Sequence, residues 1–462
     1  MSYCAPGWNR PGRFDYHPPM LFRRYGKFVG GIDLPDEKYA TLDRTIEPYQ
    51  PAGTLRVPLG VSPVGASAEA IVEPGQAVTA GQRIGAARDG GIDVFSPMAG
   101  KVVAFSAAEV AGGDEFFPSQ AVEIDVDGQS FEMPQTPPAV FDWRAASAAT
   151  LRQRIADGSI TTYRRPVISL AAWMDRARSR HCRTIVANVM ESQPMVTAAH
   201  RALVEHGAEV IRGLAILRQA MEASEAILAV DHRRTTEYQQ IVAPARTHRI
   251  DRIALPHKYP TGMDEMLLKV LARREAPPGH STLSVGFAVI DAATCLAVYR
   301  WVACGLPPLG RVVTLDGARA GRVGNFWVPF GTLCMELVAQ QEQPVIQNGP
   351  MVGVRCKPLA VVTPATDAVL ALEATVPAPP GPCIRCCWCT DHCPARLNVS
   401  ALNDAYELGQ LDRARQLVAP ACVECGVCTY VCPARLPLSQ RVKQLKRALQ
   451  GARGAMSMVT QR

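Results

Sequence analysis

The sequence predicts a multidomain α/β protein, and three observations support this prediction. The chain has 462 residues, which is enough for about three domains. Short β-branched segments come first, strands then alternate with helices, and a cysteine-rich segment follows near the C-terminus. Hydrophobic residues make up 48% of the chain and charged residues 20%, which is typical of a globular protein with a sizeable core.

The first part of the chain predicts an irregular arm followed by a small all-β unit. Residues 1–29 are rich in Pro, Gly and aromatic residues and show no clear period. Between 55 and 126, short β-branched segments are separated by Gly and Pro, which predicts short strands. Residues 72–78 and 96–102 resemble biotinyl- and lipoyl-type barrel-sandwich domains. Lys101 follows a glycine at the start of a strand, so we interpret the unit as structural and not as a swinging-arm carrier.

An α/β domain is predicted beyond a proline-rich linker at 134–138. The apolar spacing of Leu203, Val210 and Leu217 predicts a helix over 198–221. Because apolar strand segments alternate with helical ones, we expect a mainly parallel sheet. The expected strands cover residues 183–188, 225–231, 251–255 and 283–290.

The alternation changes after residue 311. Strands at 311–315 and 324–329, with a glycine-rich turn between them and a helix at 331–337, predict a compact ββα-type unit. Residues 348–353 are expected to form a tight Gly/Pro turn, and the proline-rich segment 376–382 is expected to form a hinge.

Two cysteine runs with the same spacing organise the C-terminal part. Each run follows C-x2-C-x2-C-x3-C-P, the ligand pattern of bacterial ferredoxins, in which the fourth cysteine binds the other cluster. Structural zinc is the alternative, because C-x2-C pairs also bind zinc, but a zinc site gives no role to the repeated x3-C-P ending. Cys387 is an additional thiol, which we interpret as a bystander. The predicted ligands are Cys383, Cys386, Cys389 and Cys432 for one 4Fe–4S cluster, and Cys422, Cys425, Cys428 and Cys393 for the other.

The residues between the two runs predict a helix over 401–418, with apolar residues at Leu402, Ala405 and Leu408. The clusters are therefore expected in a helix-rich module. The other seven of the 15 cysteines are scattered, which fits free thiols in a reducing compartment. No apolar run is long enough for a membrane span, and the N-terminus lacks a signal pattern, so we expect a cytoplasmic protein. The net charge of +7 comes without a nucleic-acid recognition motif, so we expect no nucleic-acid partner.

These motifs together resemble the C subunit of the Rnf ion-translocating electron-transport complex (RnfC) and the cobalamin reductase PduS. The resemblance implies an RnfC-like barrel-sandwich domain at 30–135, a Rossmann-like domain of the complex I flavoprotein type at 140–298, a β-grasp (SLBB-like) insert at 299–375 and a two-cluster ferredoxin domain at 376–440. It covers roughly residues 28 to 440. Besides the cysteine runs, it rests on GGIDLP at 30–35, NVMESQP at 188–194, KYPTG at 258–262, Tyr299-Arg300, GNFWV at 324–328 and GPMVG at 349–353.

The sequence departs from the family at the expected flavin site. The family has a glycine-dense G-x-G-G-A-G-F-P-T loop, which lets backbone N–H groups approach FMN. Residues 157–166 stand there and read DGSITTYRRP, with one glycine, and Arg164 and Arg165 either bind an anion or form a solvated turn. Asn188 and Glu191 match the flavin-side pair of the family. Two further positions differ, since Gln193 replaces a second Glu and Asp291 replaces Asn.

Two functions follow from the resemblance, besides a scaffold role that the placed cysteines argue against. The first is an electron carrier that relays electrons between redox partner proteins through the two clusters, with a degenerate FMN and NADH site. The alternative is an FMN-dependent NADH:acceptor oxidoreductase that feeds electrons to the clusters. The altered loop favours the carrier. We expect it in a multisubunit redox complex, peripheral on the inner face of the cell membrane.

The basic tail at 441–462 has a predicted role in such a complex. After Glu424 the sequence contains seven Lys and Arg residues and no acidic residue. Val442, Leu445 and Leu449 fall on one face of a predicted helix. We expect this helix to dock on an acidic or membrane-associated partner, and a solvated helix is the alternative.

Overall fold

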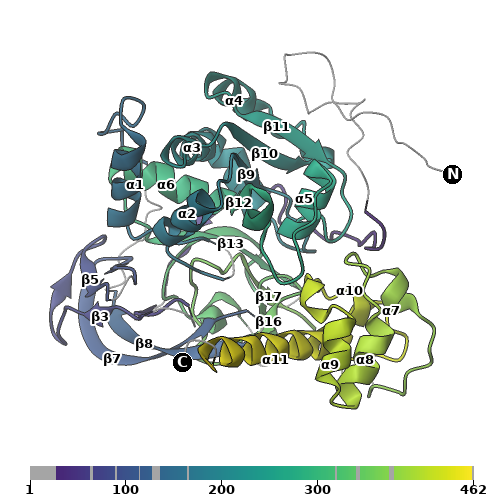
Figure 1. Ribbon diagram of the computed structural model, residues 1–462. Helices are drawn as coiled ribbons and strands as arrows, with labels where there is room; N and C mark the ends of the chain where they lie inside the picture. Colours follow the sequence, from purple (N-terminus) through teal and green to yellow (C-terminus); the bar gives the residue numbers. More distant parts are fainter. Residues whose placement is uncertain are drawn as a thin grey trace.

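The computed structural model describes residues 28–459 with gaps at 52, 63–65, 89–90, 114, 127–135, 164–165, 318–319, 340–343 and 374–378, and only the backbone from 452 to 459. The expected arm over 1–29 therefore lies almost entirely outside the described residues, as do Arg164, Arg165 and part of the hinge at 376–382. A helical module lies beside a larger body that contains all of the sheets (Figure 1).

The first domain is a sandwich of antiparallel strands, most of them short, as the sequence predicts. Leu55, Ile84, Val102 and Ile124 are fully buried between its sheets because alternate strand residues point inward. Lys101 pairs with Ala77 within a strand ladder. One sheet has the order β2 (Thr54–Pro58), β8 (Phe116–Asp125), β7 (Gly100–Ala111) and β4 (Ala77–Val78), and the other has the order β3 (Glu69–Ala70), β5 (Arg83–Ala86) and β6 (Val94–Phe95).

The second domain is built on a fully parallel four-stranded sheet, which confirms the expected topology. Alternate strand residues face two cores. Ile185 and Leu228 pack under α3 and α6, whereas Val186 and Ile227 pack under α5. The order is β11 (Asp251–Leu255), β10 (Glu225–Asp231), β9 (Thr184–Asn188) and β12 (Phe287–Asp291). The helices are α1 (Ala148–Asp157), α2 (Leu170–Ser179), α3 (Ala198–Ala220), α4 (Val242–Thr247), α5 (Asp264–Ala272) and α6 (Ala292–Cys304), with short 3-10 turns at η2 (His232–Arg234), η3 (Gln239–Ile241) and η4 (Thr282–Val285).

Two expectations about this domain need correction. The strand expected at 283–290 begins only at Phe287, because Gly286 adopts a left-handed conformation (φ +87°) that ends the 3-10 turn before it. The expected domain boundary at 298 falls inside α6, because residues 292–304 form one helix that packs on α3.

The third unit is a mixed six-stranded sheet. Its centre holds Val313, Leu315, Val328 and Val369, all fully buried. The helix expected at 331–337 is reduced to the 3-10 turn η5 (Cys334–Leu337), in which Glu336 donates its amide to Leu333. The strand order is β1 (Ile46–Pro48), β14 (Gly324–Pro329), β13 (Gly310–Asp316), β17 (Ala368–Ala371), β15 (Val345–Gln347) and β16 (Val354–Arg355).

The cysteine runs lie in a small helical module from Cys383 onward, which we call the cluster module after the clusters that its sequence predicts. The single helix expected over 401–418 is two helices, because Gly409 turns the chain with φ +65°. The elements are α7 (Trp388–Asp391), α8 (Val399–Glu407), α9 (Leu411–Gln416), η6 (Ala419–Ala421), α10 (Val427–Tyr430) and α11 (Leu438–Val459).

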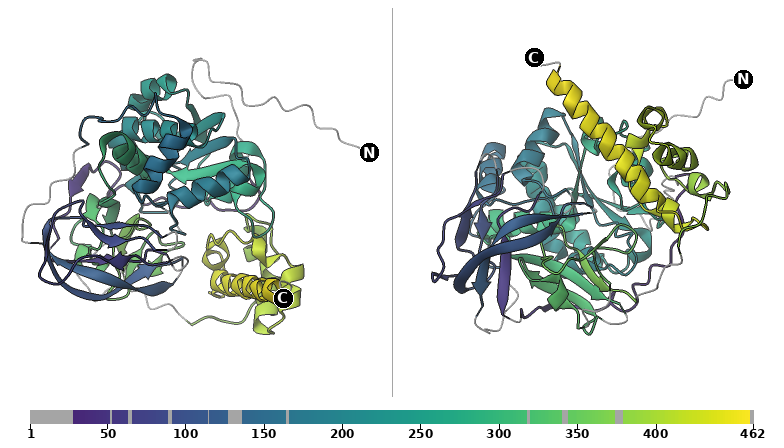
Figure 2. Two further views of the ribbon diagram at one scale, coloured as in Figure 1. Left: turned by 60° about the vertical axis from the view of Figure 1, so that its left-hand side comes forward. Right: turned by 90° about the horizontal axis from the view of Figure 1, so that it is seen from below.

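The apolar face of the tail helix is not available to a partner, which corrects the docking expectation. Val442, Leu445 and Leu449 are buried against Leu402 and Ala414 of the same module. The helix α11 begins before residue 441, so the expected tail is continuous with the cluster module and extends from it toward β7 and β8 (Figures 1 and 2). Several of its charges are paired within the chain: Arg441 with Glu407, Lys446 with Glu424, and Arg447 with Glu115. Among the described residues, no helix is both long and apolar enough to cross a membrane.

Candidate functional site

The predicted cluster ligands lie in two groups in space. Burial, together with the neighbouring thiols Cys422 and Cys393, raises the pKa of Cys425 to about 12. Burial likewise raises the pKa of Cys428, with Cys393 again among its neighbours. Cys393, the last cysteine of the first run, is therefore placed with the second run. The other group, which lines one small cavity, contains Cys383, Cys386, Cys389 and Cys432, with Cys387 beside them.

Backbone amides already approach two of the sulfur atoms. The amide of Leu397 donates to Cys393 Sγ at 3.4 Å, and the amide of Glu424 donates to Cys422 Sγ at 3.4 Å. Such donors stabilise thiolate ligands and tune the potential of a cluster. Within the described part of the chain, no three His, Cys, Asp or Glu side chains are arranged around a single metal-ion site.

The second cysteine run packs directly against the α/β domain. The buried Tyr259 donates its hydroxyl to the carbonyl oxygen of Cys425 at 2.6 Å, and Gln193 Nε2 donates to the Tyr259 hydroxyl at 3.0 Å. Gln193 Oε1 also accepts from the amide of Met351 at 3.3 Å. Gln193, which stands where the family has Glu, therefore joins the loop after β9, the third unit and the cluster module through one hydrogen-bond network.

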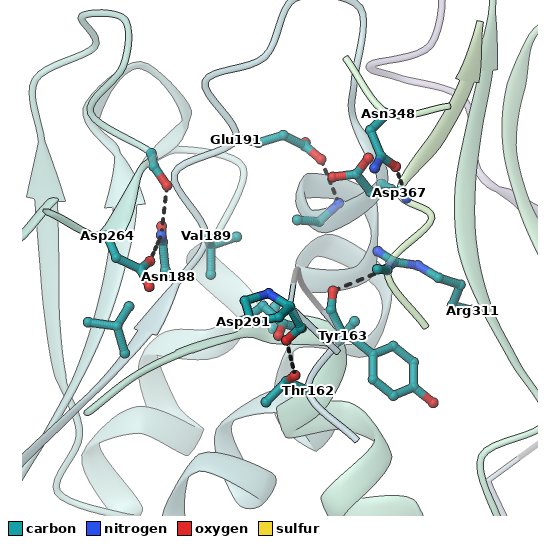
Figure 3. Close-up of a pocket in the computed structure, with 18 of the residues that line it drawn as sticks. Thr162, Tyr163, Asn188, Val189, Glu191, Asp264, Asp291, Arg311, Asn348 and Asp367 are labelled. Carbon is teal, nitrogen blue, oxygen red and sulfur yellow. Dashed lines mark hydrogen bonds between the residues drawn. The ribbon is translucent and has the colours of Figure 1, made fainter. Parts of the chain in front are cut away.

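A cavity of about 720 Å³ lies where this contact meets the sheet. It opens at the carboxyl ends of β9 and β12, where the strand order changes direction and where ligands bind in open α/β sheets. Its volume is sufficient for a nucleotide-sized ligand. The lining includes Thr162, Asn188, Glu191, Asp291 and Arg311 (Figure 3). It also reaches Cys422 of the cluster module.

Asn188 lies at this cavity, but its amide is held by the protein itself. Asn188 is the last residue of β9 and is the register partner of Asp291, the last residue of β12. Its Nδ2 donates to the carbonyl oxygen of Gly262 at 2.9 Å and to Asp264 Oδ1 at 3.3 Å. Its Oδ1 accepts from the amide of Met190 at 3.0 Å. Asn188 thus shapes the turn after β9 and presents few unused polar groups.

Glu191 also lies at the cavity and caps a helix. Its carboxylate accepts from the amides of Ala199 at 2.9 Å and His200 at 3.3 Å in the first turn of α3. Burial raises its pKa, and the Lys38 ammonium, 4.0 Å away, opposes that rise. Burial in turn lowers the pKa of Lys38. The two residues form a buried pair in which each charge depends on the other.

Asp291 likewise lies at the cavity and caps the helix α6. Its Oδ1 accepts from the amide of Thr294 at 2.7 Å, and its Oδ2 accepts from the Thr294 hydroxyl at 2.6 Å. Helix N-termini are favourable positions for phosphate groups. The N-termini of α3 and α6 therefore both carry a carboxylate of the chain, so an anionic ligand at either of them must displace it or bind elsewhere.

The loop that replaces the glycine-rich segment is packed inward. The amide of Tyr163 donates to the Thr294 hydroxyl at 2.8 Å, and Arg311 donates to the Tyr163 carbonyl at 3.2 Å. The Tyr163 ring lies against Phe330, with centroids 5.9 Å apart, and burial raises the Tyr163 pKa. Thr162 and Tyr163 line the cavity without filling it. We expect the side chains of this loop to occupy part of the flavin space. Tyr163 turns toward the third unit, and Arg164 and Arg165 lie outside the described residues.

Sequence reasoning missed Tyr259, Gln193 as a connecting residue, and Lys38. Tyr259 lies within the KYPTG motif, which marked it as part of the family pattern without indicating its contact. Lys38 had no signal, because its partner Glu191 is 153 positions away in the sequence.

Comparisons with known proteins define the class of this fold and site. Residues 26–129 match the RnfC barrel sandwich hybrid domain, and residues 169–300 match the Nuo51 FMN-binding domain. The second match begins just after the altered loop at 157–166. Two segments of the chain are thus similar to an RnfC-type barrel-sandwich domain and to a domain of the complex I FMN-binding class.

The particular relationship is to RnfC, and the resemblance read from the motifs is confirmed. The chain is 30% identical to the C subunit of the ion-translocating oxidoreductase complex of Edwardsiella ictaluri (strain 93-146) over 386 residues, covering 81% of this chain and 48% of that protein. It is 29% identical to the protein of the same name from Cronobacter sakazakii (strain ATCC BAA-894), covering 80% of this chain and 48% of that protein. The chain therefore spans about half the length of these curated relatives.

A comparison with solved structures found a NAD+-reducing [NiFe]-hydrogenase in the H2-reduced state. It has 15% sequence identity and a TM-score of 0.46, and the match covers 71% of this chain and 69% of that chain. The air-oxidised state of such a hydrogenase has 16% identity and a TM-score of 0.43, with 66% and 55% covered.

Proposed function

We propose that this chain relays single electrons through two 4Fe–4S clusters as one member of a redox complex. The observation that carries the proposal is the crossed grouping of the cysteines, in which Cys393 lies with the second run and Cys432 with the first. That grouping is what the repeated C-x2-C-x2-C-x3-C-P spacing requires of two clusters.

The residues fit such clusters in three respects. Each group contains four thiols, the donor type that 4Fe–4S clusters use. Backbone amides donate to Cys393 and Cys422. Pro394 and Pro433 follow the last cysteine of each run and lack an N–H, so the chain leaves each site without extending a helix. When bound, the clusters would supply one-electron oxidation and reduction.

The names of the relatives indicate the kind of complex in which this chain would act. The curated relatives are named as the C subunits of ion-translocating oxidoreductase complexes. We place this chain in a comparable assembly of several proteins, in the cytoplasm and peripheral to the membrane on its inner face. The chain's role there is to hold the two cysteine groups against a cavity-bearing α/β domain.

A second candidate function, FMN-dependent NADH oxidation, is favoured by the open cavity. The cavity of about 720 Å³ contacts both the FMN-binding-type domain and Cys422, so a ligand there would adjoin the second cysteine group. Against it stand Glu191 and Asp291, which already occupy the helix N-termini. The relay does not depend on this cavity, so we regard it as the better supported function.

One experiment tests both candidates. Protein reconstituted anaerobically with iron, sulfide and excess FMN is freed of unbound material and analysed for iron, sulfide, zinc and flavin. The relay predicts about eight irons per chain and little flavin. Stoichiometric zinc with no brown colour would overturn it, and near-stoichiometric flavin with rapid NADH-dependent reduction of a one-electron acceptor would establish the oxidoreductase instead.

A further inference from the structure

Two cysteines outside the runs lie in contact within the third unit. Cys334 begins the 3-10 turn η5, and Cys356 directly follows the strand β16. Both side chains pack in the same hydrophobic core, and the two thiols are hydrogen-bonded to each other. Neither cysteine is among the predicted cluster ligands, so the pair is a separate chemical feature of the chain.

The backbone holds both cysteines at this contact. The amide of Cys334 donates to the carbonyl oxygen of Ala360 at 2.8 Å, and the amide of Cys356 donates to the carbonyl oxygen of Val345 at 2.7 Å. Val345 is the first residue of β15, which pairs with β16 and lies beside η5. The sheet and the turn thus keep the two thiols together, and such proximity is what a disulfide bond requires.

The two thiols differ in their access to solvent. Cys356 is only partly buried and stands between the exposed residues Arg355 and Lys357. Cys334 is 0% exposed. The hydrogen bond to Cys356, together with burial, raises the pKa of Cys334 well above its ordinary value. A reagent in solution therefore meets Cys356 first, while Cys334 is shielded and stays protonated.

The chain between the two cysteines contains the loop that contacts the cluster module. Residues 348–353 connect β15 to β16, and the amide of Met351 donates to Gln193 Oε1 at 3.3 Å. A Cβ atom at Gly426 would collide with the carbonyl oxygen of Met351, so the loop backbone approaches the second cysteine run directly. Cys356 follows β16, which places the thiol pair at the base of this loop.

We propose that Cys334 and Cys356 form a reversible disulfide by exchange with a small-molecule disulfide such as oxidised glutathione. The bond would join η5 to the end of β16 and so restrict the loop at 348–353 where it meets the second cysteine run. Under reducing conditions the pair stays as two thiols, and intracellular disulfides of this kind are typically transient and redox-sensing. The proposal does not depend on the proposed function, because neither thiol is a predicted cluster ligand.

The exchange takes two balanced steps. Cys356 gives up its proton and attacks one sulfur of oxidised glutathione, so that a mixed disulfide forms and one glutathione leaves and takes up a proton. Cys334 then gives up its proton and attacks the Cys356 sulfur, and the second glutathione leaves with a proton in the same way. The two cysteine thiols lose two electrons in total, and the glutathione disulfide gains the same two.

Mass spectrometry of the full-length, reconstituted chain tests the bond. The chain is incubated anaerobically with excess oxidised glutathione, free thiols are alkylated, and the protein is digested with trypsin. Trypsin cleaves after Arg355, between the two cysteines, so the disulfide should join two peptides. Fragmentation must place the bond at Cys356, because the same peptide also carries Cys383. We expect the linked pair in most of the chains, its loss on treatment with dithiothreitol, and an unchanged iron content.

Two variants assign the roles of the thiols. Cys334→Ala should stop the reaction at the mixed disulfide, which appears as a stable glutathione adduct on Cys356. Cys356→Ser should show neither an adduct nor a cross-link at Cys334, because Cys334 is buried. The matched control is Cys182→Ser, since Cys182 is also a buried thiol outside the runs, and it should form the cross-link as the wild type does.

Hydrogen–deuterium exchange tests the effect on the loop. Exchange of residues 348–353 should slow severalfold in the oxidised wild type and stay unchanged in oxidised Cys334→Ala, because only the wild type is cross-linked. A wild-type chain in which Cys334 and Cys356 are not linked would overturn the proposal, as would adduct formation at Cys334 in Cys356→Ser. Iron lost in step with the thiols would show that cluster ligands react instead, and equal exchange of the loop in both redox states would show that the bond does not restrict it.

Discussion

The hydroxyl of Tyr259 donates a hydrogen bond of 2.6 Å to the carbonyl oxygen of Cys425, so the α/β domain holds the second cysteine run by its backbone. Tyr259 is fully buried and also accepts from Gln193. The cluster module is thus attached at the point where the large cavity meets the predicted ligands.

Tyr259→Phe should loosen this attachment. The substitution leaves the buried Cys425 carbonyl without its donor, which costs about 1–3 kcal/mol. Hydrogen–deuterium exchange should rise in residues 422–432 and stay unchanged in the parallel sheet. Tyr39→Phe is the control, because Tyr39 is 83% exposed. Equal exchange in the two variants would show that the contact does not hold the module.

The crossed grouping of cysteines predicts distinct defects for single substitutions. Cys393→Ala should damage the cluster held mainly by the second run, and Cys432→Ala the one held mainly by the first. Electron paramagnetic resonance of the reduced variants distinguishes the two signals. Cys387→Ala is the internal control and should leave both signals intact. If Cys393→Ala and Cys432→Ala each removed the signal of their own run, the ligands would not cross.

The substitution Asp291→Asn should increase the affinity of the chain for FMN. Asn is as good a helix N-cap as Asp, so the α6 cap is retained while one negative charge leaves the cavity wall. We expect a slightly lower melting temperature, because the single Asn oxygen cannot accept from both the amide and the hydroxyl of Thr294, and a severalfold lower dissociation constant for FMN by fluorescence quenching. Thr294→Val removes the hydroxyl that Asp291 accepts and serves as the comparison. FMN affinity that did not respond to Asp291→Asn would mean that this charge does not limit binding.

Leu445→Ala should destabilise the cluster module. Leu445 is buried among the helices of the module, and truncating a buried leucine costs about 2–5 kcal/mol. Thermal unfolding and iron retention should both fall. Leu408→Ala, at an exposed position, should change stability by no more than about 0.5 kcal/mol. An unaffected Leu445→Ala protein would mean that α11 does not pack on the module in solution.

His200 should make the protein less stable as pH falls. Burial, aided by nearby cations such as Arg234, lowers its pKa from 6.5 to about 3, although Glu237 Oε2 lies 3.0 Å from Nε2. The unfolded chain then binds a proton below pH 6.5 that the folded chain does not, so stability falls as pH drops through that range. The loss should reach about 2 kcal/mol at pH 5.

The variant His200→Gln isolates this effect. It should be less stable than the wild type at pH 7.5 because it loses the bond between Nδ1 and the Tyr238 hydroxyl, 2.8 Å long. The difference in melting temperature should narrow on acidification to pH 5. A substitution at the exposed His181 provides the control. If the difference in melting temperature between the wild type and His200→Gln did not change with pH, His200 would not be neutral and buried in the folded protein.

Much of the fold follows from local pattern. Each segment carries its own signal, namely the spacing of its apolar residues and the turn residues at its ends. This made it possible to predict the strands at 184–188, 225–231 and 251–255 and the helix at 198–220. The spacing of the cysteine runs likewise predicts which thiols belong together, since that pairing is a property of the motif. Family motifs predicted the barrel-sandwich and FMN-binding-type domains.

What covers each surface was decided only by the tertiary structure. The pattern of Val442, Leu445 and Leu449 shows that one helix face is apolar, but the same pattern fits burial in its own module or docking on a partner. The sequence of the substituted loop does not show where its side chains point, and the structure places the Tyr163 ring against Phe330 of the third unit. Residues 383–396 and 422–435 share their cysteine spacing, yet Val427 is buried and Trp388, at the equivalent position, is exposed. Contacts such as Tyr259 with Cys425 join residues 166 positions apart, and no local period encodes a pairing over that distance.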